Sequence, residues 1–368
     1  MKILIVVWAR PNFMKVAPII SYIEKHTSIE YILLHTGQHF DKNMSENIFH
    51  DLWLPEPHIN LNIHGGTSCE QIGRIMIEFD KVVKEQHLDY VLVVGDVNST
   101  FACAVTAKHN GIKVIHVEAG LRSGDMTMPE EINRILTDSI TDLYFLTEEE
   151  AVDNLKTEWK EEGVHLVGNM MIECLISQLP AIDNRKTLVD LWVAPNQYAL
   201  VTLHRPSNVD TAENLVQYLK YFAQLADRVP IVISLHPRTV AAIEKFQLQS
   251  YLEHPSIIQT GPQWYLDFIH LVKNSVFVLT DSGGVQEETT YLQIPCLTMR
   301  ENTERPVTCV LGTNILVGSD FDTITTHIDS ILDGSYKKWE IPPFRDEQTS
   351  ARIITKVLED YTKTWKSA

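Results

Sequence analysis

Short apolar runs bounded by turn residues recur along the whole chain, and they constrain its fold more than any other feature. The segments between these runs, such as 70–85, carry apolar residues at helical spacing. Strands that are apolar on both faces and alternate with helices are typical of a parallel sheet with helices on both sides. The runs that we expect to form strands are 3–9, 31–37, 90–96, 113–120, 143–147 and 165–169, followed by 198–204, 230–236, 256–261, 276–284, 294–299 and 314–318.

The two sets of runs predict two doubly wound α/β domains. A length of 368 residues suits two such domains better than one. The stretch 168–190 is rich in turn residues, so we expect a Rossmann-like N-terminal domain over 1–170 and a Rossmann-like C-terminal domain over 171–348. The segment 349–361 reads as an amphipathic helix. Facing each other, two such domains would form a central cleft lined by the carboxyl ends of the strands, where ligands bind in sheets of this type.

The composition excludes several classes of partner. The formal net charge is −17, whereas a general nucleic-acid binder needs a basic surface, so we expect no nucleic acid as a partner. No apolar run approaches the roughly 18 residues that span a bilayer, so we expect no membrane insertion. The first run is interpreted as a buried strand and not as a signal peptide, because it is short and Arg10 follows at once.

The cysteines and histidines show no pattern of a metal site. The five cysteines are odd in number and include no C-x-x-C pair, so we expect no disulfide framework, no zinc site and a reducing, cytoplasmic location. His35 and His39 stand close together, but a metal site needs three or four converging ligands, so we expect no metal. The G-x-G-x-x-G motif is absent, so the Rossmann-like pattern does not by itself imply a dinucleotide.

Cationic side chains and a glycine pair at strand ends are candidates for binding phosphate. Ser282-Gly283-Gly284 follows an apolar run and opens a helical segment, where backbone N–H groups and the helix dipole would hold an anion. Glu288, one turn further, would accept hydrogen bonds from ribose hydroxyls. An ordinary glycine turn with a serine cap is the alternative, and for Lys15, Arg205 and Arg238 the alternative is a surface cation. The cationic candidates are Arg10, Lys15, His204, Arg205, His236, Arg238 and Arg305.

Carboxylates near strand ends are candidates for acid–base chemistry. Asp96 and Glu118 end neighbouring runs, and Glu130 and Glu131 follow a short loop. Desolvation and like charges raise a carboxyl pKa in a closed site, which suits proton transfer near neutral pH. The alternative is helix capping for Asp96 and Glu118, and for Glu131 it is a side chain that points away from the site.

Ten sequence blocks, in a fixed order, resemble those of one enzyme family. They are W-A-R-P-N-F-M-K-V-A-P (8–18), T-G-Q-H (36–39), V-G-D-V-N-S-T (94–100), H-V-E-A-G-L-R-S-G-D (116–125), M-P-E-E-I-N-R (128–134), V-G-N-M-M-I (167–172), T-L-H-R-P-S-N-V-D (202–210), H-P-R-T (236–239), D-S-G-G-V-Q-E-E (281–288) and T-E-R-P (303–306). Each block alone would be a weak signal. Together they resemble the non-hydrolysing UDP-N-acetylglucosamine 2-epimerases from residue 1 to about residue 318.

The resemblance implies a GT-B fold whose C-terminal domain binds UDP, with the helix 349–368 crossing back to the first domain. It implies a homodimer that converts UDP-GlcNAc reversibly to UDP-ManNAc by elimination and re-addition of UDP through a 2-acetamidoglucal, without NAD, metal or another cofactor. By motif position it assigns catalysis to Asp96, Glu118, Glu130 and His204, and binding of the UDP-sugar to Arg10, Lys15, Arg134, Arg205, His236, Phe268, Ser282, Gly283, Gly284, Glu288 and Arg305.

Several related activities stay open at this point. The nearest is 2-epimerisation of a modified UDP-sugar such as UDP-2,3-diacetamido-glucuronic acid, whose acidic C6 would call for an extra cation. A hydrolysing epimerase would release ManNAc and UDP, and a GT-B glycosyltransferase would need an acceptor site. A nucleotide-sugar binding protein would not need all three of the carboxylates Asp96, Glu118 and Glu130. Trp8-Ala9 stands where the family usually has Gly-Thr or Gly-Ala, which affects the first loop.

Overall fold

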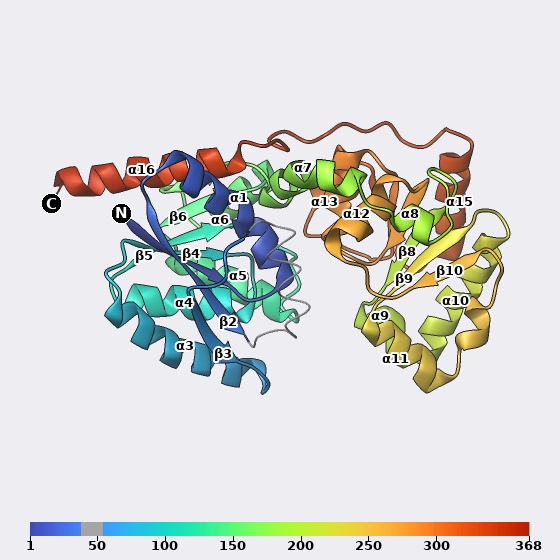
Figure 1. Cartoon of the computed structure of the whole chain (residues 1–368), viewed down its shortest axis with the longest axis horizontal. Helices are drawn as coiled ribbons and strands as arrows, with labels where there is room; N and C mark the ends of the chain where they lie inside the picture. Colours follow the sequence, from blue (N-terminus) through green and yellow to red (C-terminus); the bar gives the residue numbers. More distant parts are fainter. Residues whose placement is uncertain (38–53, 368) are drawn as a thin grey trace. The chain divides into compact units, whose positions relative to one another are not determined.

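The computed structural model describes residues 1–37 and 54–367, which form two compact units (Figure 1). Unit 1 comprises Met1–Ser177 together with Pro343–Ala368, and unit 2 comprises Gln178–Pro342. The sequence places the first boundary at residue 170, whereas the chain leaves unit 1 inside helix α7 (Met170–Asp183).

The first half of α7 belongs to unit 1 because it packs there against the returning chain. Ile172 is fully buried, and the carboxylate of Glu173 accepts a hydrogen bond from the backbone N–H of Ser350 at 2.7 Å. The returning chain also enters unit 1 before residue 349, since the guanidinium of Arg345 donates to the carbonyl of Thr147 at 2.7 Å. These contacts explain both differences from the expected boundaries.

Unit 1 is built on a parallel sheet with the strand order β3-β2-β1-β4-β5-β6-β7. All of its strands except β3 match the expected runs. β3 alternates apolar and asparagine residues, which is typical of a half-exposed strand and not of a fully buried one. The strands are β1 (Lys2–Val7), β2 (Glu30–Gly37), β3 (Ile59–Ile63), β4 (Tyr90–Val94), β5 (Lys113–Val117), β6 (Leu143–Leu146) and β7 (Val164–Leu166).

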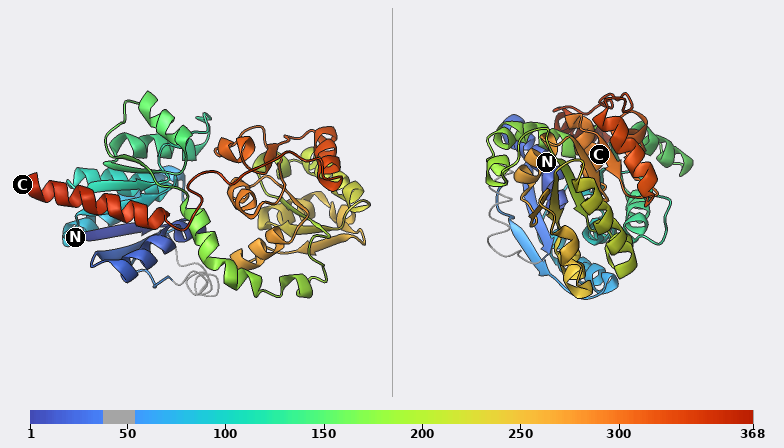
Figure 2. Two further views of the ribbon diagram at one scale, coloured as in Figure 1. Left: turned by 90° about the horizontal axis from the view of Figure 1, so that it is seen from above. Right: turned by 90° about the vertical axis from the view of Figure 1, so that its right-hand side faces the viewer.

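Helices cover the unit 1 sheet. In Figures 1 and 2, the C-terminal helix α16 lies beside α1, and α3, α4 and α5 pack against one another in turn. Asp360 fastens α16, because its carboxylate accepts from the hydroxyl of Tyr90 at 2.6 Å and from Nζ of Lys113 at 2.7 Å. None of the helices in the described ranges is both long and apolar enough to cross a bilayer. Besides α7, the helices of unit 1 are α1 (Arg10–His26), α3 (Ser68–Glu85), α4 (Asn98–His109), α5 (Pro129–Ile140), α6 (Glu149–Thr157) and α16 (Thr349–Ser367).

Unit 2 repeats the architecture with the parallel strand order β10-β9-β8-β11-β12-β13. Both faces of this sheet are buried: Val201 of β8 lies in one apolar cluster and its neighbour Leu200 in another. The strands are β8 (Ala199–Leu203), β9 (Ile231–Leu235), β10 (Ile257–Thr260), β11 (Phe277–Thr280), β12 (Cys296–Thr298) and β13 (Asn314–Leu316). The helices are α8 (Thr187–Asp190), α9 (Pro206–Val209), α10 (Ala212–Ala226), α11 (Pro237–Phe246), η1 (Gln249–Leu252), α12 (Tyr265–Lys273), α13 (Val285–Leu292), α14 (Pro306–Val310) and α15 (Phe321–Leu332).

Both sheets have the doubly wound order, which confirms the α/β fold class with two Rossmann-like halves, as in GT-B proteins. The strand order reverses between β1 and β4 in unit 1, and between β8 and β11 in unit 2. Ligands of such sheets bind beyond the carboxyl ends of the strands at these switch points. The residues that follow these four strands are therefore the first to consider as a site.

Candidate functional site

The carboxyl edge of the unit 1 sheet places two acidic residues at the ends of neighbouring strands. Asp96 comes just after β4 and Glu118 just after β5, and the last residues of these strands, Val94 and Val117, are paired in register. Gly95 and Glu118 both have left-handed backbones, with φ of 66° and 70°. That conformation costs a glutamate on the order of 1–3 kcal/mol, so the surrounding structure must hold Glu118 in place.

Glu118 forms an ion pair with Lys15 of α1. The two side chains are 7% and 14% exposed, so water screens their attraction little. Gly95 lies against the same cation, since a Cβ added there would be 3.0 Å from Nζ of Lys15. The left-handed φ and the close approach therefore both favour glycine at this position. The structure places Lys15, a predicted phosphate ligand, beside a predicted catalytic carboxylate.

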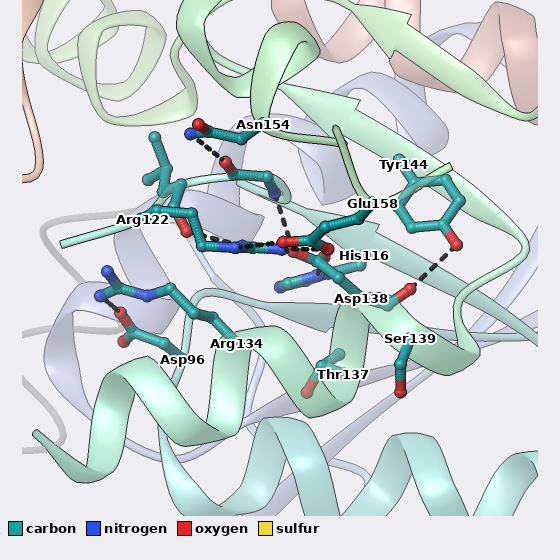
Figure 3. A network of polar contacts seen from close by, with 12 residues as sticks. Asp96, His116, Arg122, Arg134, Thr137, Asp138, Ser139, Tyr144, Asn154 and Glu158 are labelled. Atoms are coloured by element: carbon teal, nitrogen blue, oxygen red, sulfur yellow. Dashed lines mark hydrogen bonds and ion pairs between the residues drawn. The ribbon is translucent and has the colours of Figure 1, made fainter. Parts of the chain in front are cut away.

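Arg134 of α5 holds the side chain of Asp96. Its guanidinium donates to the carboxylate of Asp96 (Figure 3) and, at 2.8 Å, to that of Glu131. The preceding residue, Asn133, donates its amide to the backbone carbonyl of Asp96 at 3.0 Å. Two consecutive residues of α5 thus fix both the backbone and the side chain of Asp96.

The two adjacent glutamates at the start of α5 have different surroundings. Glu130 is exposed on the first turn of the helix. Glu131 is 1% exposed, and its carboxylate accepts hydrogen bonds from the backbone N–H groups of Ser123 at 2.9 Å and Gly124 at 3.0 Å. Glu131 therefore anchors the loop before α5, while Glu130 is accessible to a ligand.

The loop before α1 contains the departure Trp8-Ala9 from the family pattern. Asn12 shapes this loop, because its Oδ1 accepts from the backbone N–H groups of both residues at 3.2 and 3.1 Å. A Cβ on Gly37, the last residue of β2, would lie 2.7 Å from Cδ1 of the tryptophan, so the indole packs directly on this glycine. Arg10 is the first residue of α1. The predicted T-G-Q-H block continues into Gln38-His39, which lies outside the described residues.

A buried carboxylate organises the carboxyl edge of unit 2. Asp281 directly follows β11 and accepts hydrogen bonds from the backbone N–H groups of His204 at 2.9 Å and Arg205 at 2.7 Å, and from the amide of Asn208 at 3.0 Å. Burial raises the pKa of Asp281, but the hydrogen bonds and the charge of His204 outweigh it, so the pKa lies below its ordinary value. Asp281 is therefore ionised at neutral pH and ties the loop after β8 to the glycine turn.

The Ser282-Gly283-Gly284 turn leads from β11 into α13, where the sequence predicts it. Two guanidinium groups lie close to it: a Cβ on Gly283 would be 3.4 Å from Nη1 of Arg300 and 4.0 Å from Nη2 of Arg205. Arg300 is also paired with Glu304 at 3.1 Å. The backbone N–H of Ser282 already donates to Oγ1 of Thr280 at 3.0 Å, and Oε2 of Glu304 would lie 3.6 Å from the same Cβ. The helix start, its dipole and the two guanidinium groups favour an anion at this turn.

Two histidines stand at the same edge of unit 2. Nδ1 of His204 lies 2.8 Å from Oδ1 of Asp281, and the ring centroids of His204 and His236 are 5.5 Å apart. Burial lowers the pKa of His236, and the nearby His204 lowers it further. Arg238, in contrast, pairs with Asp210 at 2.6 Å on the exposed surface, which is the alternative that the sequence left open.

The remaining predicted residues of unit 2 lie on or next to α12, α13 and α14. Glu288 is buried on α13, one turn after the glycines. Arg305 precedes α14, with its Nε 4.0 Å from Oε1 of Glu287. Phe268 of α12 is partly buried and packs against the apolar core. These residues therefore belong to the same unit as the anion-binding turn.

Comparison with known proteins decides the family. Residues 21–358 match the family model of the UDP-N-acetylglucosamine 2-epimerases. The chain belongs to the UDP-N-acetylglucosamine 2-epimerase family. Epimerases are isomerases, so this epimerase-family chain is an enzyme of that class.

Two relatives and one solved structure show how far the similarity to other epimerases extends. A UDP-N-acetylglucosamine 2-epimerase of Methanocaldococcus jannaschii is 40% identical over 96% of this chain and 98% of its own. The UDP-2,3-diacetamido-2,3-dideoxy-D-glucuronate 2-epimerase of Pseudomonas aeruginosa is also 40% identical, over 88% of this chain and 90% of its own. The crystal structure of the M. jannaschii UDP-GlcNAc 2-epimerase in complex with UDP-GlcNAc and UDP matches with a TM-score of 0.88 and 39% identity, covering 98% of this chain and all of that one. Identity alone therefore does not select the sugar.

Two residues of this epimerase-family chain stand out only in the structure. Asp281 and Arg300 are not among them, because both stand at the ends of apolar runs in the sequence. His116 of β5 and Asp138 of α5 form a buried pair (Figure 3). His116 opens the family block 116–125, but no sequence signal links it to Asp138, because their contact depends on how α5 packs on the sheet.

Proposed function

We propose that this chain catalyses the reversible C2 epimerisation of UDP-GlcNAc to UDP-ManNAc by elimination and re-addition of UDP. The observation that carries the proposal is the arrangement of Asp96 and Glu118 at the ends of β4 and β5, each paired with a cation from a helix. Membership of the epimerase family supports the reaction class.

In this proposal unit 2 binds the UDP part of the substrate. The N–H groups and hydroxyl of Ser282-Gly283-Gly284 hold the diphosphate, and nearby cations neutralise its charge. Glu288 accepts hydrogen bonds from the ribose, and the backbone near Phe268 reads the uracil. The presence of UDP-GlcNAc and UDP in the crystals of the M. jannaschii enzyme supports this ligand. The side chains assigned to the nucleotide and diphosphate are Arg10, Arg205, His236, Arg300 and Arg305.

The chemistry assigned to unit 1 follows from the weak acidity of the sugar. No carbonyl lies beside C2, so loss of its proton must accompany departure of UDP from C1. A base takes the proton, the C–H electron pair becomes the C1–C2 double bond of the 2-acetamidoglucal, and the C1–O electron pair leaves with UDP. A proton then reaches the opposite face of C2 as a phosphate oxygen of UDP adds back to C1. The sugar undergoes no net oxidation, so this route requires no hydride acceptor.

Two faces of one carbon require at least two proton-transfer groups, or one that moves. Asp96, Glu118 and Glu130 come from three different elements and supply these groups. Lys15 is paired with Glu118, so in this proposal it acts on that carboxylate as well as adding positive charge for the diphosphate. His204 assists departure of the diphosphate, oriented by Asp281. Exclusion of water protects the glycal from side reactions.

A second candidate substrate is UDP-2,3-diacetamido-2,3-dideoxy-D-glucuronate, favoured by the 40% identity to the P. aeruginosa enzyme. Its sugar carboxylate would need a cation of its own. In unit 1, Lys15, Arg122 and Arg134 are each already paired with carboxylates of the chain. The neutral sugar of UDP-GlcNAc needs no such cation.

Proton NMR of the purified chain with UDP-GlcNAc in D2O tests the proposal. We expect UDP-ManNAc to appear and both epimers to acquire deuterium at C2. Epimerisation without deuterium at C2 would rule out the elimination route. Release of free ManNAc and UDP would instead indicate the hydrolysing reaction, and turnover of the diacetamido-glucuronate alone would indicate the second substrate.

Two further expectations stay predictions. The homodimer implied by the family resemblance is tested by light scattering of the purified chain. The cytoplasmic location is tested by fractionation of cells that express it.

A further inference from the structure

A histidine and an aspartate of unit 1 are fully buried. His116 of β5 and Asp138 of α5 are each 0% exposed, and Nδ1 of His116 lies 2.7 Å from Oδ1 of Asp138 (Figure 3). The other ring nitrogen, Nε2, lies 2.8 Å from the carbonyl oxygen of Gly95. The imidazole therefore connects α5 to the residue that directly precedes Asp96.

Both nitrogens of the His116 ring contact oxygen atoms of the chain. A carbonyl oxygen only accepts hydrogen bonds, so Nε2 donates to Gly95. The second oxygen of Asp138 accepts from the backbone N–H of Gly120 at 3.0 Å and from Arg122 at 2.8 Å. Burial raises the pKa of Asp138, but the charges and hydrogen bonds of His116 and Arg122 outweigh it, so the pKa lies below its ordinary value. The contact is therefore a buried hydrogen bond between His116 and an ionised Asp138.

This pair joins the segments that carry the three proposed catalytic carboxylates. Through Gly95 it holds the left-handed turn before Asp96. Through Gly120 it holds the turn after Glu118, whose own backbone is left-handed. Through Asp138 it holds α5, the helix whose first turn contains Glu130. Three segments that are separate in the sequence are thus connected through the contact between His116 and Asp138.

We propose that His116 and Asp138 are positioning residues whose buried contact sets the relative positions of Asp96, Glu118 and Glu130. The inference rests on the proposed function, since it concerns carboxylates that transfer protons. A displacement of about 1 Å in a catalytic group costs on the order of 100-fold in rate. A purely structural pair would instead lower stability and leave the kcat of the folded enzyme unchanged.

Substitutions of His116 separate its two contacts. His116→Asn places an amide donor where Nδ1 lies, so it keeps the bond to Asp138 and loses the bond to Gly95. His116→Gln places an amide donor near the position of Nε2, so it keeps the bond to Gly95. Tyr144→Phe is the matched control, because the buried Tyr144 hydroxyl donates to the backbone carbonyl of Asp138 at 2.9 Å and its loss perturbs the same helix without removing a side-chain contact of the pair.

Two readouts are measured on the full chain: kcat and KM for UDP-GlcNAc, corrected for the folded fraction, and amide hydrogen exchange of 95–97 and 118–120. For His116→Gln, which breaks the contact with Asp138, we expect kcat to fall about 10- to 100-fold with KM changed less than about threefold, and both segments to exchange faster. His116→Asn, which keeps that contact, should retain more activity than His116→Gln. Tyr144→Phe should keep the wild-type kcat and exchange in both segments.

The inference is overturned if folded His116→Gln keeps wild-type kcat and exchange, or if Tyr144→Phe lowers kcat as much as His116→Gln. Turnover by the wild-type chain in the same assay tests the proposed function separately. The exchange measurement decides the positioning role even if the wild type does not act on UDP-GlcNAc, because it depends on no substrate. Unchanged exchange in that case would overturn the inference.

Discussion

Nδ1 of His204 lies 2.8 Å from Oδ1 of Asp281, and the same carboxylate accepts the backbone N–H groups of His204 and Arg205. A single buried aspartate thus orients an imidazole and the loop that carries it. Removal of this acceptor would leave several buried donors without a partner, which is costly in a protein interior.

Replacement of this carboxylate tests its role in unit 2. We expect Asp281→Asn to lower the free energy of unfolding by about 3–5 kcal/mol. The NH2 group of the new asparagine would face the N–H donors that now bond to Asp281, and the substitution removes the buried negative charge beside His204. UDP binding should weaken, since the glycine turn follows directly. Urea unfolding and titration calorimetry measure the two effects. Asp210→Asn is the control, because it breaks only an exposed ion pair with Arg238, and it should change neither the stability nor the binding of UDP. Equal stability of the two variants would contradict the structural role of Asp281.

The adjacent glutamates of α5 offer a crossed pair of substitutions. Glu130→Gln should lower kcat about 100-fold or more at unchanged melting temperature, because the side chain is exposed and is assigned to proton transfer. Glu131→Gln should lower the melting temperature, because the Glu131 carboxylate holds Ser123, Gly124 and Arg134. Calorimetric melting and steady-state rates distinguish them. If Glu130→Gln retains full activity, the assignment of Glu130 is wrong.

The Lys15–Glu118 ion pair predicts strong coupling between the two side chains. Lys15→Met should destabilise the fold by about 3 kcal/mol, because it removes the cation paired with a buried carboxylate. Glu118→Gln alone should abolish most of the activity, and adding Glu118→Gln to Lys15→Met should restore part of the lost stability. A double-mutant cycle from urea unfolding measures the coupling. Additive effects of the two substitutions would show that the pair does not stabilise the fold.

The binding of UDP-GlcNAc should depend on pH through His236. Burial, and then His204, lower the pKa of His236, so its imidazole is neutral at pH 7 in the free protein. A diphosphate favours the imidazolium, so binding takes up a proton and affinity should rise as the pH falls from about 8 to about 6. Calorimetry in buffers of different ionisation enthalpy reports this proton. His236→Asn keeps a residue suited to the start of α11 and should remove the pH dependence of binding. The same pH dependence in the wild type and the variant would exclude His236 as its source.

The pattern of apolar residues determines the two sheets of this protein. A strand such as β1 or β8, apolar on both faces, is stable only when helices cover the sheet on both sides, so the runs predict parallel doubly wound units without knowledge of contacts. The apolar runs do not predict β3, because its apolar residues alternate with asparagines, as in a strand with one exposed face.

The sequence also determines which residues lie at the functional edge. Because the carboxyl ends of parallel strands share one edge, residues that directly follow apolar runs, such as Asp96, Glu118 and His204, are predicted there from their position alone. The family motifs add the reaction class, which no strand pattern contains.

Only the tertiary structure decides which side chains act together. Lys15 with Glu118, Arg134 with Asp96 and His116 with Asp138 are pairs between different elements, and the geometry of their contact depends on how helices dock on the sheet. The same docking turns Glu131 inward and leaves Glu130 exposed, although the two are neighbours with the same side chain. Local sequence does not encode these choices, because burial and partner distance are properties of the packed fold.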